Sequence, residues 1–214
     1  MKLFGTINRK SFNMLKLRFA LAEVGVEYEF VPVDLTNGEQ KAPAFLAMNP
    51  HGKVPVLLDG SFALPESDAI LWYIAEKFPD ARVLPAAGGL SAVEARARVM
   101  QWCNFASTAL YPAYADFWTY ALGAAEKRLL WAAELAQQKL TRNLDLLEAV
   151  VAGREYLVGP DAGSLSIADL SNASMVNTLK LKMPSDPFAD RPNLSAWFRR
   201  VTSRPSWIKA TDGS

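Results

Sequence analysis

The sequence predicts an α/β domain followed by an all-helical domain, and three observations support this fold class. Residues 1–80 alternate strand and helix patterns, whereas residues 90–214 show helix patterns only. Residues 79–89 between them are rich in Pro, Gly and Ala, which is typical of a break between domains. The chain of 214 residues is long enough for two small domains. We therefore expect one domain over residues 1–80 and another over residues 90–214.

The elements of the first domain follow the order β-α-β-α-β-β-α. Runs of β-formers predict the strands, and apolar residues at helical spacing predict the helices. The expected elements are a strand at 2–6, a helix at 12–24, a strand at 28–33, a helix at 43–48, strands at 54–58 and 61–64, and a helix at 66–78. Asp59-Gly60 is a strong hairpin signal between the last two strands. This order predicts a mixed sheet.

Two long apolar stripes define the second domain. The first predicts a helix that Pro112 bends, and the second predicts a straighter helix that ends at Gly153. The first stripe is Val93, Ala97, Met100, Cys103, Leu110, Tyr114, Phe117 and Ala121, and the second is Leu129, Ala133, Ala136, Leu140, Leu144, Leu147 and Val151. Shorter helices are expected at 167–181 and 194–201.

Composition argues against several classes of function. Half of the residues are apolar and the net charge is +1, which gives no electrostatic reason to expect nucleic acid or an anionic membrane as a partner. No stretch approaches the roughly 20 apolar residues of a membrane span. Cys103 and His51 are the only cysteine and histidine, so an internal disulfide and a cysteine-based metal site are excluded. We expect a cytoplasmic protein that holds no metal.

A proline at the mouth of an internal strand is the first unusual feature. In the segment Asn49-Pro-His-Gly-Lys-Val-Pro-Val-Leu57, Pro55 has no N–H to donate to a sheet. A cis Val54–Pro55 bond would turn the chain and expose the backbone N–H and C=O of Val54, with which a short peptide could pair. The simpler alternative is an edge-strand proline.

A second feature lies where the next helix begins, at Glu66-Ser67. The backbone N–H groups and the dipole of a helix N-terminus attract a carboxylate, and the Ser67 hydroxyl could add a hydrogen bond to it. Glu66 could receive an ammonium group, so the pair suits an amino-acid head group. Alternatively, Ser67 is a plain helix cap.

These segments closely resemble the glutathione transferase family, which carries an Asn-Pro-x-Gly-x-Val-Pro-x-Leu segment and a Glu-Ser-x-Ala-Ile helix start. The similarity extends over the whole chain and includes Leu165-Ser-Ile-Ala-Asp-Leu170, which looks like a helix-capping segment of that family, and Arg200–Ser206. The resemblance implies a thioredoxin-like domain that binds glutathione, a helical domain that contributes the electrophile pocket, and a homodimer.

The resemblance also implies a set of glutathione contacts. Val54 would pair with the cysteinyl backbone, Glu66 and Ser67 would hold the γ-glutamyl end, and three side chains would hold the glycine carboxylate. The implied glutathione-binding residues are Phe12, Gln40, Lys41, Lys53, Val54, Pro55, Glu66 and Ser67. For Lys41 and Lys53, an ordinary solvated surface is the alternative.

The catalytic residue follows from what comes after the first strand. No tyrosine precedes Tyr28 and Cys103 lies far away, so the tyrosine and cysteine types of the family are excluded. Ser11 corresponds to the serine of phi-like and theta-like classes, and Asn13 to the functional asparagine of nu-like members. Phe12 departs from the proline or small residue usual there. Ser11 could also simply cap the helix.

A hydroxyl donor at a helix N-terminus is sufficient to ionise a thiol. Lowering a thiol pKa by two units requires about 2.7 kcal/mol, and one hydrogen bond to a charged group supplies about 1.5–3 kcal/mol. The helix dipole adds up to about 1 kcal/mol, and Arg9 or Lys10 could contribute further. No general base is needed for attack on a bound electrophile.

Aromatic residues are expected to line the electrophile pocket, with core packing as the alternative for each. The candidates are Phe12, Tyr111, Tyr114, Phe117 and Trp118. Two other functions stay open at this point. One is a glutathione-dependent peroxidase or disulfide reductase of the nu-like kind, which Asn13 favours, and the other is a non-catalytic binding module with the same fold.

Overall fold

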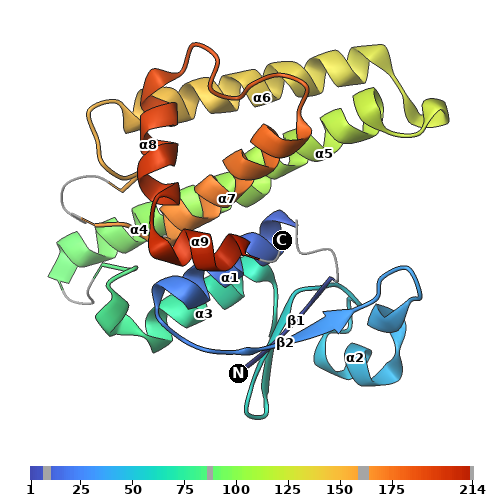
Figure 1. Ribbon diagram of the computed structural model, residues 1–214, viewed down its shortest axis with the longest axis vertical. Coiled ribbons are helices and arrows are strands. Elements are labelled where there is room, and N and C mark those ends of the chain that lie inside the picture. Colours follow the sequence, from blue (N-terminus) through green and yellow to red (C-terminus); the bar gives the residue numbers. More distant parts are fainter. Residues whose placement is uncertain (7–10, 86–88, 159–163, 213–214) are drawn as a thin grey trace. The chain divides into compact units, whose positions relative to one another are not determined.

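The computed structural model describes residues 1–6, 11–85, 89–158 and 164–212 (Figure 1). The chain divides into two compact units, one formed by Met1–Ala86 with Thr202–Ser214 and the other by Ala87–Val201. The C-terminal segment is where this division differs from the expected domains, because residues 202–212 pack with the first unit rather than with the helices that precede them.

A four-stranded mixed sheet in the order β2-β1-β3-β4 forms the centre of the first unit. Its strands are β1 (Lys2–Thr6), β2 (Glu29–Val33), β3 (Val56–Asp59) and β4 (Phe62–Pro65). β1 runs parallel to β2 and antiparallel to β3, while β3 and β4 form the hairpin predicted from Asp59-Gly60. The expected mixed sheet is confirmed.

β3 begins two residues later than the sequence suggested. The ladder starts at Val56, which lies opposite Phe4 of β1 and Pro65 of β4, and not at Val54. Since Pro55 has no N–H to donate, regular pairing can begin only after it.

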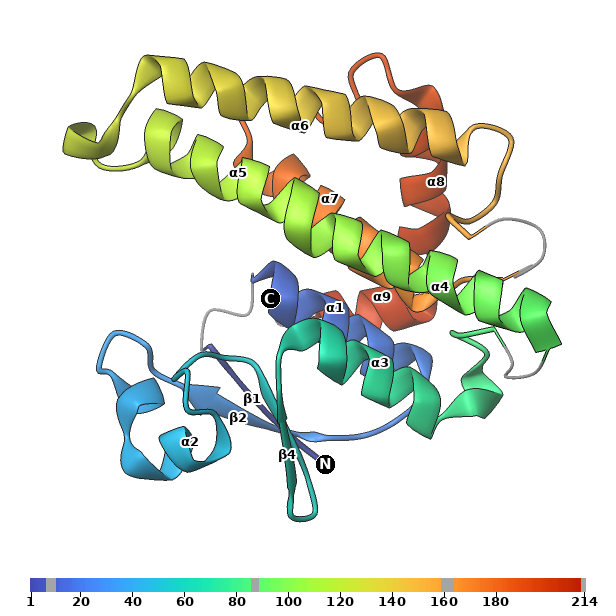
Figure 2. The same ribbon diagram turned by 180° about the vertical axis from the view of Figure 1, so that it is seen from behind.

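Helices cover both faces of this sheet (Figures 1 and 2). They are α1 (Phe12–Glu23), the short 3₁₀ turn η1 (Glu39–Lys41), α2 (Pro43–Met48), α3 (Ser67–Lys77) and the 3₁₀ turn η2 (Pro79–Ala81). Alternation along β1 assigns the faces. A Cβ at Gly5 would meet Met14 of α1 at 2.3 Å, whereas Phe4 packs edge-on against Phe45 of α2 at 6.4 Å. α1 and α2 therefore lie on opposite faces of the sheet.

A C-terminal helix that the sequence did not predict completes the first unit. α9 (Pro205–Thr211) lies beside α1, as Figure 1 shows. The Trp207 ring packs edge-on against Phe19 at 5.1 Å, and both Arg204 and Ser206 donate to the Glu23 carboxylate. These contacts explain why the C-terminal segment groups with the first unit.

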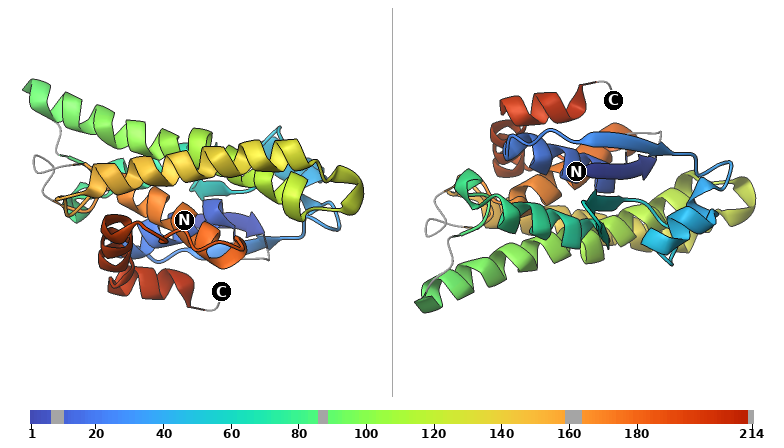
Figure 3. Two further views of the ribbon diagram at one scale, coloured as in Figure 1. Left: turned by 90° about the horizontal axis from the view of Figure 1, so that it is seen from above. Right: turned by 90° about the horizontal axis from the view of Figure 1, so that it is seen from below.

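The second unit is helical in the part of it that the structure describes. Its elements are α4 (Gly89–Phe105), the π-helical segment η3 (Ala106–Leu110), α5 (Tyr111–Phe117), the π-helical segment η4 (Trp118–Leu122), the 3₁₀ turn η5 (Ala125–Lys127), α6 (Leu130–Val151), α7 (Ile167–Lys182) and α8 (Pro192–Thr202). α6 packs along α5, which is seen from two further directions in Figure 3. No described helix is long and apolar enough to cross a membrane.

Pro112 lies just after a widened helical turn. It is the second residue of α5 and directly follows the π-helical segment η3. Since proline lacks the N–H that would bond to the preceding turn, a π segment at this point accommodates it without ending the rod.

The first apolar stripe is correct in part. Cys103, Leu110 and Phe117 are buried, but Val93 and Met100 are exposed. The buried face of α4 instead runs through Ala95, Val99, Trp102 and Ala106, because neighbouring positions on a helix differ by about 100°. The second stripe is buried from Ala133 to Val151, and only its first member, Leu129, is exposed.

The expected capping segment at the start of α7 is confirmed. Ser166 and Asp169 form a capping box, and the Asp169 carboxylate also accepts from Leu157 N and from Trp197 Nε1, both at 2.9 Å. Burial raises the pKa of Asp169, and these donors oppose that rise. One carboxylate thus joins the loop before α7 to α8.

Candidate functional site

Asn49 organises the loop that leads into β3. Its side chain is buried, its Nδ2 donates to the carbonyl of Lys53 at 2.7 Å, and its Oδ1 accepts from His51 N at 3.1 Å. This bracing holds the four residues before Val54 as a turn. The Val54–Pro55 bond is cis, so the expectation from the sequence is confirmed.

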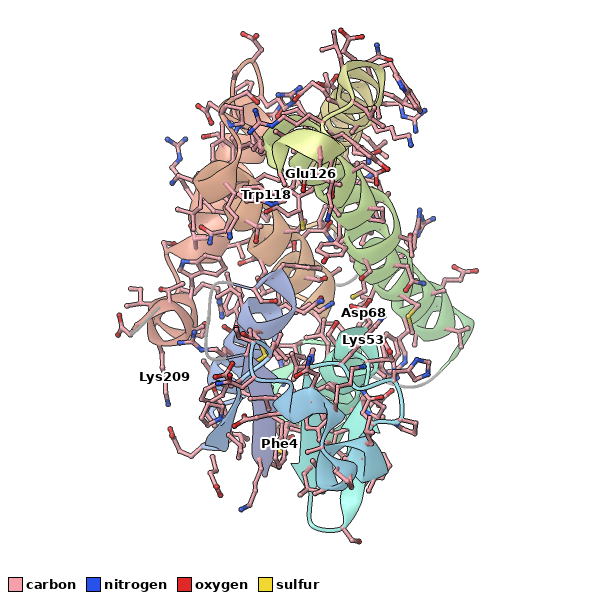
Figure 4. All side chains as sticks on the ribbon, turned by 90° about the vertical axis from the view of Figure 1, so that its right-hand side faces the viewer. Phe4, Lys53, Asp68, Trp118, Glu126 and Lys209 are labelled. Carbon is pink, nitrogen blue, oxygen red and sulfur yellow. The ribbon has the colours of Figure 1, made fainter. Side chains whose placement is uncertain are left out.

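Gly52 places this loop against the residues predicted to hold a glycine carboxylate. Its φ is +59°, and a Cβ there would lie 2.8 Å from Lys41 Nζ and 2.9 Å from the carbonyl oxygen of Gln40. Lys53 follows directly and is exposed (Figure 4). Gln40 Nε2 donates to the carbonyl of Leu35 at 3.3 Å. The structure therefore brings Gln40, Lys41 and the loop that carries Lys53 together.

α3 begins in an unusual backbone conformation. Glu66, the residue before its first turn, has φ 68° and ψ 112°, a region that non-glycine residues rarely adopt. The Glu66 side chain is exposed, and its carbonyl accepts from Ile70 N at 2.9 Å. The start of an eleven-residue helix therefore follows a strained residue, which is frequent at binding sites.

The start of α1 meets the start of α3 through side chains. The Ser67 hydroxyl donates to Asn13 Oδ1 at 3.0 Å. It does not cap its own helix, so the simpler interpretation of Ser67 as a helix cap is not what the structure shows. Ser11 is half-buried and occupies the N-cap position of α1, yet its hydroxyl makes no capping hydrogen bond. Arg9 and Lys10 lie outside the described residues.

An ion pair one turn further along α1 joins the same two helices. Lys16 Nζ lies 2.5 Å from Asp68 Oδ1, and the Lys16 side chain is fully buried. The same ammonium lies 4.6 Å from the centre of the Phe12 ring, itself buried. Asp68 is in the first turn of α3, where a carboxylate also benefits from the helix dipole (Figure 4).

The aromatic residues of the second unit separate into two groups. Tyr111, Tyr114 and Trp118 follow one another along α5 with ring centroids 6.4 and 6.2 Å apart, and both Tyr111 and Trp118 are exposed. Burial, with a smaller effect of Tyr111, raises the pKa of Tyr114. Phe117 is buried in the structure, and Lys182 Nζ lies 5.5 Å from the centre of the Trp118 ring.

Comparison with known proteins identifies the family. A model of the glutathione S-transferase N-terminal domain matches residues 1–76, and a model of the corresponding C-terminal domain matches residues 113–210. Glutathione S-transferase F10 from Arabidopsis thaliana is 34% identical over 194 residues, which cover 87% of this chain and 86% of that protein. The chain belongs to the glutathione S-transferase family.

Solved structures of glutathione transferases share the fold over nearly the whole chain. Glutathione transferase F7 from Populus trichocarpa has a TM-score of 0.82 at 31% identity, with 99% of this chain and 98% of that chain covered. Glutathione transferase URE2P6 from Phanerochaete chrysosporium, solved in complex with oxidized glutathione, has a TM-score of 0.85 at 26% identity, covering 98% of this chain and 93% of that chain. The thioredoxin-like first domain and the helical second domain are thus those of a glutathione transferase.

Three residues of this glutathione transferase went without a role in the sequence analysis. Asn49 was part of the motif, but its bracing of the loop was not foreseen, although Asn before Pro is a common turn signal. Lys16 and Asp68 carried no signal, because they lie 52 positions apart and each suits the surface of a helix.

Proposed function

We propose that this glutathione transferase binds glutathione on its first unit and ionises the thiol for attack on a small hydrophobic electrophile. The observation that carries the proposal is the hydrogen bond between Ser67 and Asn13. It supports a site in which the start of α3 receives the γ-glutamyl end while the start of α1 faces the sulfur. Thiolate formation needs hydrogen-bond donors there, and Ser11 and Asn13 are the candidates.

The remaining contacts of the proposed complex follow the sequence prediction. Val54 pairs with the cysteinyl backbone beside Pro55, and Glu66 receives the ammonium of the head group. The glycine carboxylate lies near Gln40, Lys41 and Lys53, where an ammonium group suits a carboxylate as a point charge. The short separation between Gly52 and Lys41 supports this placement.

For the electrophile, the exposed faces of Tyr111, Tyr114 and Trp118 support a binding surface, since aromatic rings offer large apolar contact areas. Phe12 and Phe117 are both buried and stay predictions as pocket residues. We also propose a cytoplasmic homodimer without a metal.

The deciding experiment titrates the thiol of bound glutathione through its ultraviolet absorbance. In the wild-type protein the pKa should lie well below the ordinary thiol value of about 8.5. Ser11→Ala and Asn13→Ala should each raise it, because each removes a donor to the thiolate. A wild-type protein that binds no glutathione in calorimetry, or that leaves the thiol pKa unchanged, would overturn the transferase proposal.

A second function is favoured by the position of Asn13. Its contact with Ser67 gives the asparagine a defined place beside the head-group site, as expected for a peroxidase or disulfide reductase of the nu-like kind. If Asn13→Ala alone shifts the titration, and the protein reduces cumene hydroperoxide faster than it conjugates 1-chloro-2,4-dinitrobenzene, this second function replaces the first.

A further inference from the structure

The contact between Ser67 and Asn13 has a direction that decides what each group can offer a ligand. A serine hydroxyl carries one proton, and here that proton is donated to Asn13 Oδ1 at 3.0 Å. While it stays there, it is not available to a ligand carboxylate. The carboxylate can still be bound by backbone N–H groups of the first turn of α3, which have no partner within the helix.

The same contact determines which end of the Asn13 amide is presented to the site. An amide side chain accepts through Oδ1 and donates through Nδ2. With Oδ1 held by Ser67, the two hydrogens on Nδ2 are directed elsewhere. Without that hydroxyl, the amide can turn by half a rotation about its last bond and present Oδ1 instead. A carbonyl oxygen beside a thiolate is repelled by it, whereas an N–H group stabilises it.

The two helices that carry these residues are held at this separation by a second link. Asn13 and Lys16 are three residues apart on α1 and therefore share a face, and Ser67 and Asp68 are adjacent at the start of α3. The buried Lys16 ammonium lies 2.5 Å from Asp68. Breaking a buried ion pair is costly, so this pair keeps Asn13 within reach of Ser67.

We propose that Ser67 is a positioning residue for ionisation of the thiol: its hydroxyl orients the Asn13 amide so that Nδ2 donates to the cysteinyl sulfur of glutathione. This inference rests on the proposed glutathione site and deepens it. Recognition of the head group and ionisation of the sulfur are then coupled through a single hydrogen bond between α3 and α1.

A double-mutant cycle read on the thiol pKa tests this coupling. Ser67→Ala should raise the pKa of bound glutathione by about one unit, which lowers the thiolate fraction about tenfold at acidic pH. Asn13→Ala should raise it by at least as much. The double variant should shift the pKa no further than Asn13→Ala alone, because Ser67 acts through Asn13. Ser67→Thr keeps a hydroxyl and should restore a low pKa.

Two further variants separate positioning from general damage. Ser206→Ala is the matched control, since Ser206 also lies in the first turn of a helix and donates to a side chain of α1, and it should leave the pKa unchanged. Asn13→Asp keeps the acceptor for Ser67 but has no N–H, so it should raise the pKa even if Ser67→Ala does not fold.

The outcomes are distinguishable from failure of the proposed function. Binding of S-methylglutathione, whose sulfur cannot ionise, reports the head-group site alone. If Ser67→Ala weakens binding of both compounds but leaves the thiol pKa at the wild-type value, Ser67 is only a carboxylate ligand and the inference is wrong. Additive shifts in the double variant would also overturn it. A wild-type protein that binds neither compound would remove the proposed function itself.

Discussion

At the scale of single residues, two glycines of the first unit have the same backbone conformation in different surroundings. Gly52 has φ +59° and Gly60 has φ +61°. A side chain at Gly60 would meet nothing within 4 Å, whereas one at Gly52 would meet Lys41 Nζ and the backbone of Gln40. Any L-residue at either position has the cost of a left-handed conformation, about 1–2 kcal/mol. The crowding exists only at Gly52.

This difference predicts that Gly52→Ala weakens glutathione binding more than Gly60→Ala does. The new methyl group must displace Lys41 or the η1 backbone, and both belong to the proposed carboxylate site. Calorimetry with glutathione measures the affinity, and urea unfolding measures the stability of each variant. Both variants should lose stability from the shared backbone strain. Equal glutathione affinities in the two variants would show that the loop around Gly52 is not part of the site.

At the scale of elements, α9 is held on α1 by one large aromatic contact and by ion pairs. Trp207 is 8% exposed and packs against Phe19, while its neighbour Ile208 is 53% exposed. Arg204 donates to Glu23, and Lys209 Nζ lies 2.5 Å from Glu27 Oε1. Pairs as exposed as Lys209–Glu27 typically contribute less than about 1 kcal/mol, so the aromatic contact is the main source of stability.

We therefore expect Trp207→Ala to destabilise the protein by about 3–5 kcal/mol, the usual cost of removing a buried tryptophan. Ile208→Ala, in the same turn but facing outward, should change the free energy of unfolding by less than about 0.5 kcal/mol. Urea denaturation followed by circular dichroism measures both. If the two substitutions have similar effects, α9 is not anchored through Trp207.

At the scale of the whole molecule, the proposed homodimer has a different structural basis from the one that the sequence suggested. The sequence argument relied on an apolar outer surface of the helix at 66–78, but Leu71, Ile74 and Ala75 of α3 are buried within the chain. The exposed apolar residues are on α4, where Val93 is 61% and Met100 is 38% exposed. A two-fold partner that covers α4 would bury them.

This arrangement predicts a particle of twice the 23.5 kDa chain mass in light scattering at micromolar concentration. Val93→Glu combined with Met100→Lys should shift the mass toward that of one chain, because charges resist burial in an apolar interface. Leu130→Glu is the control, since Leu130 is more exposed than either but lies at the start of α6. A wild-type mass near 23.5 kDa would contradict the homodimer.

Much of the first domain could be predicted because its signals are local. Asp59-Gly60 marks a hairpin on its own, Gly25 ends a helix, and Pro43 begins one, so most element ends lie within one or two residues of their expected positions. The segment through Val54 and Pro55 announced its cis bond in the same way. Helical stripes were less reliable for α4, since a helix with many apolar residues has more than one plausible face.

The sequence by itself determined the order of the elements, the family and which stretches could contact glutathione, because periodicity and turn chemistry act between near neighbours. The tertiary structure decided which of these residues meet. Ser67 donates to a side chain 54 positions away, Lys16 pairs across 52 positions, and Arg204 reaches Glu23 across 181. Such pairs leave no local pattern, since each partner alone is an ordinary surface residue. Only the packing of α1, α3 and α9 brings them within hydrogen-bond distance.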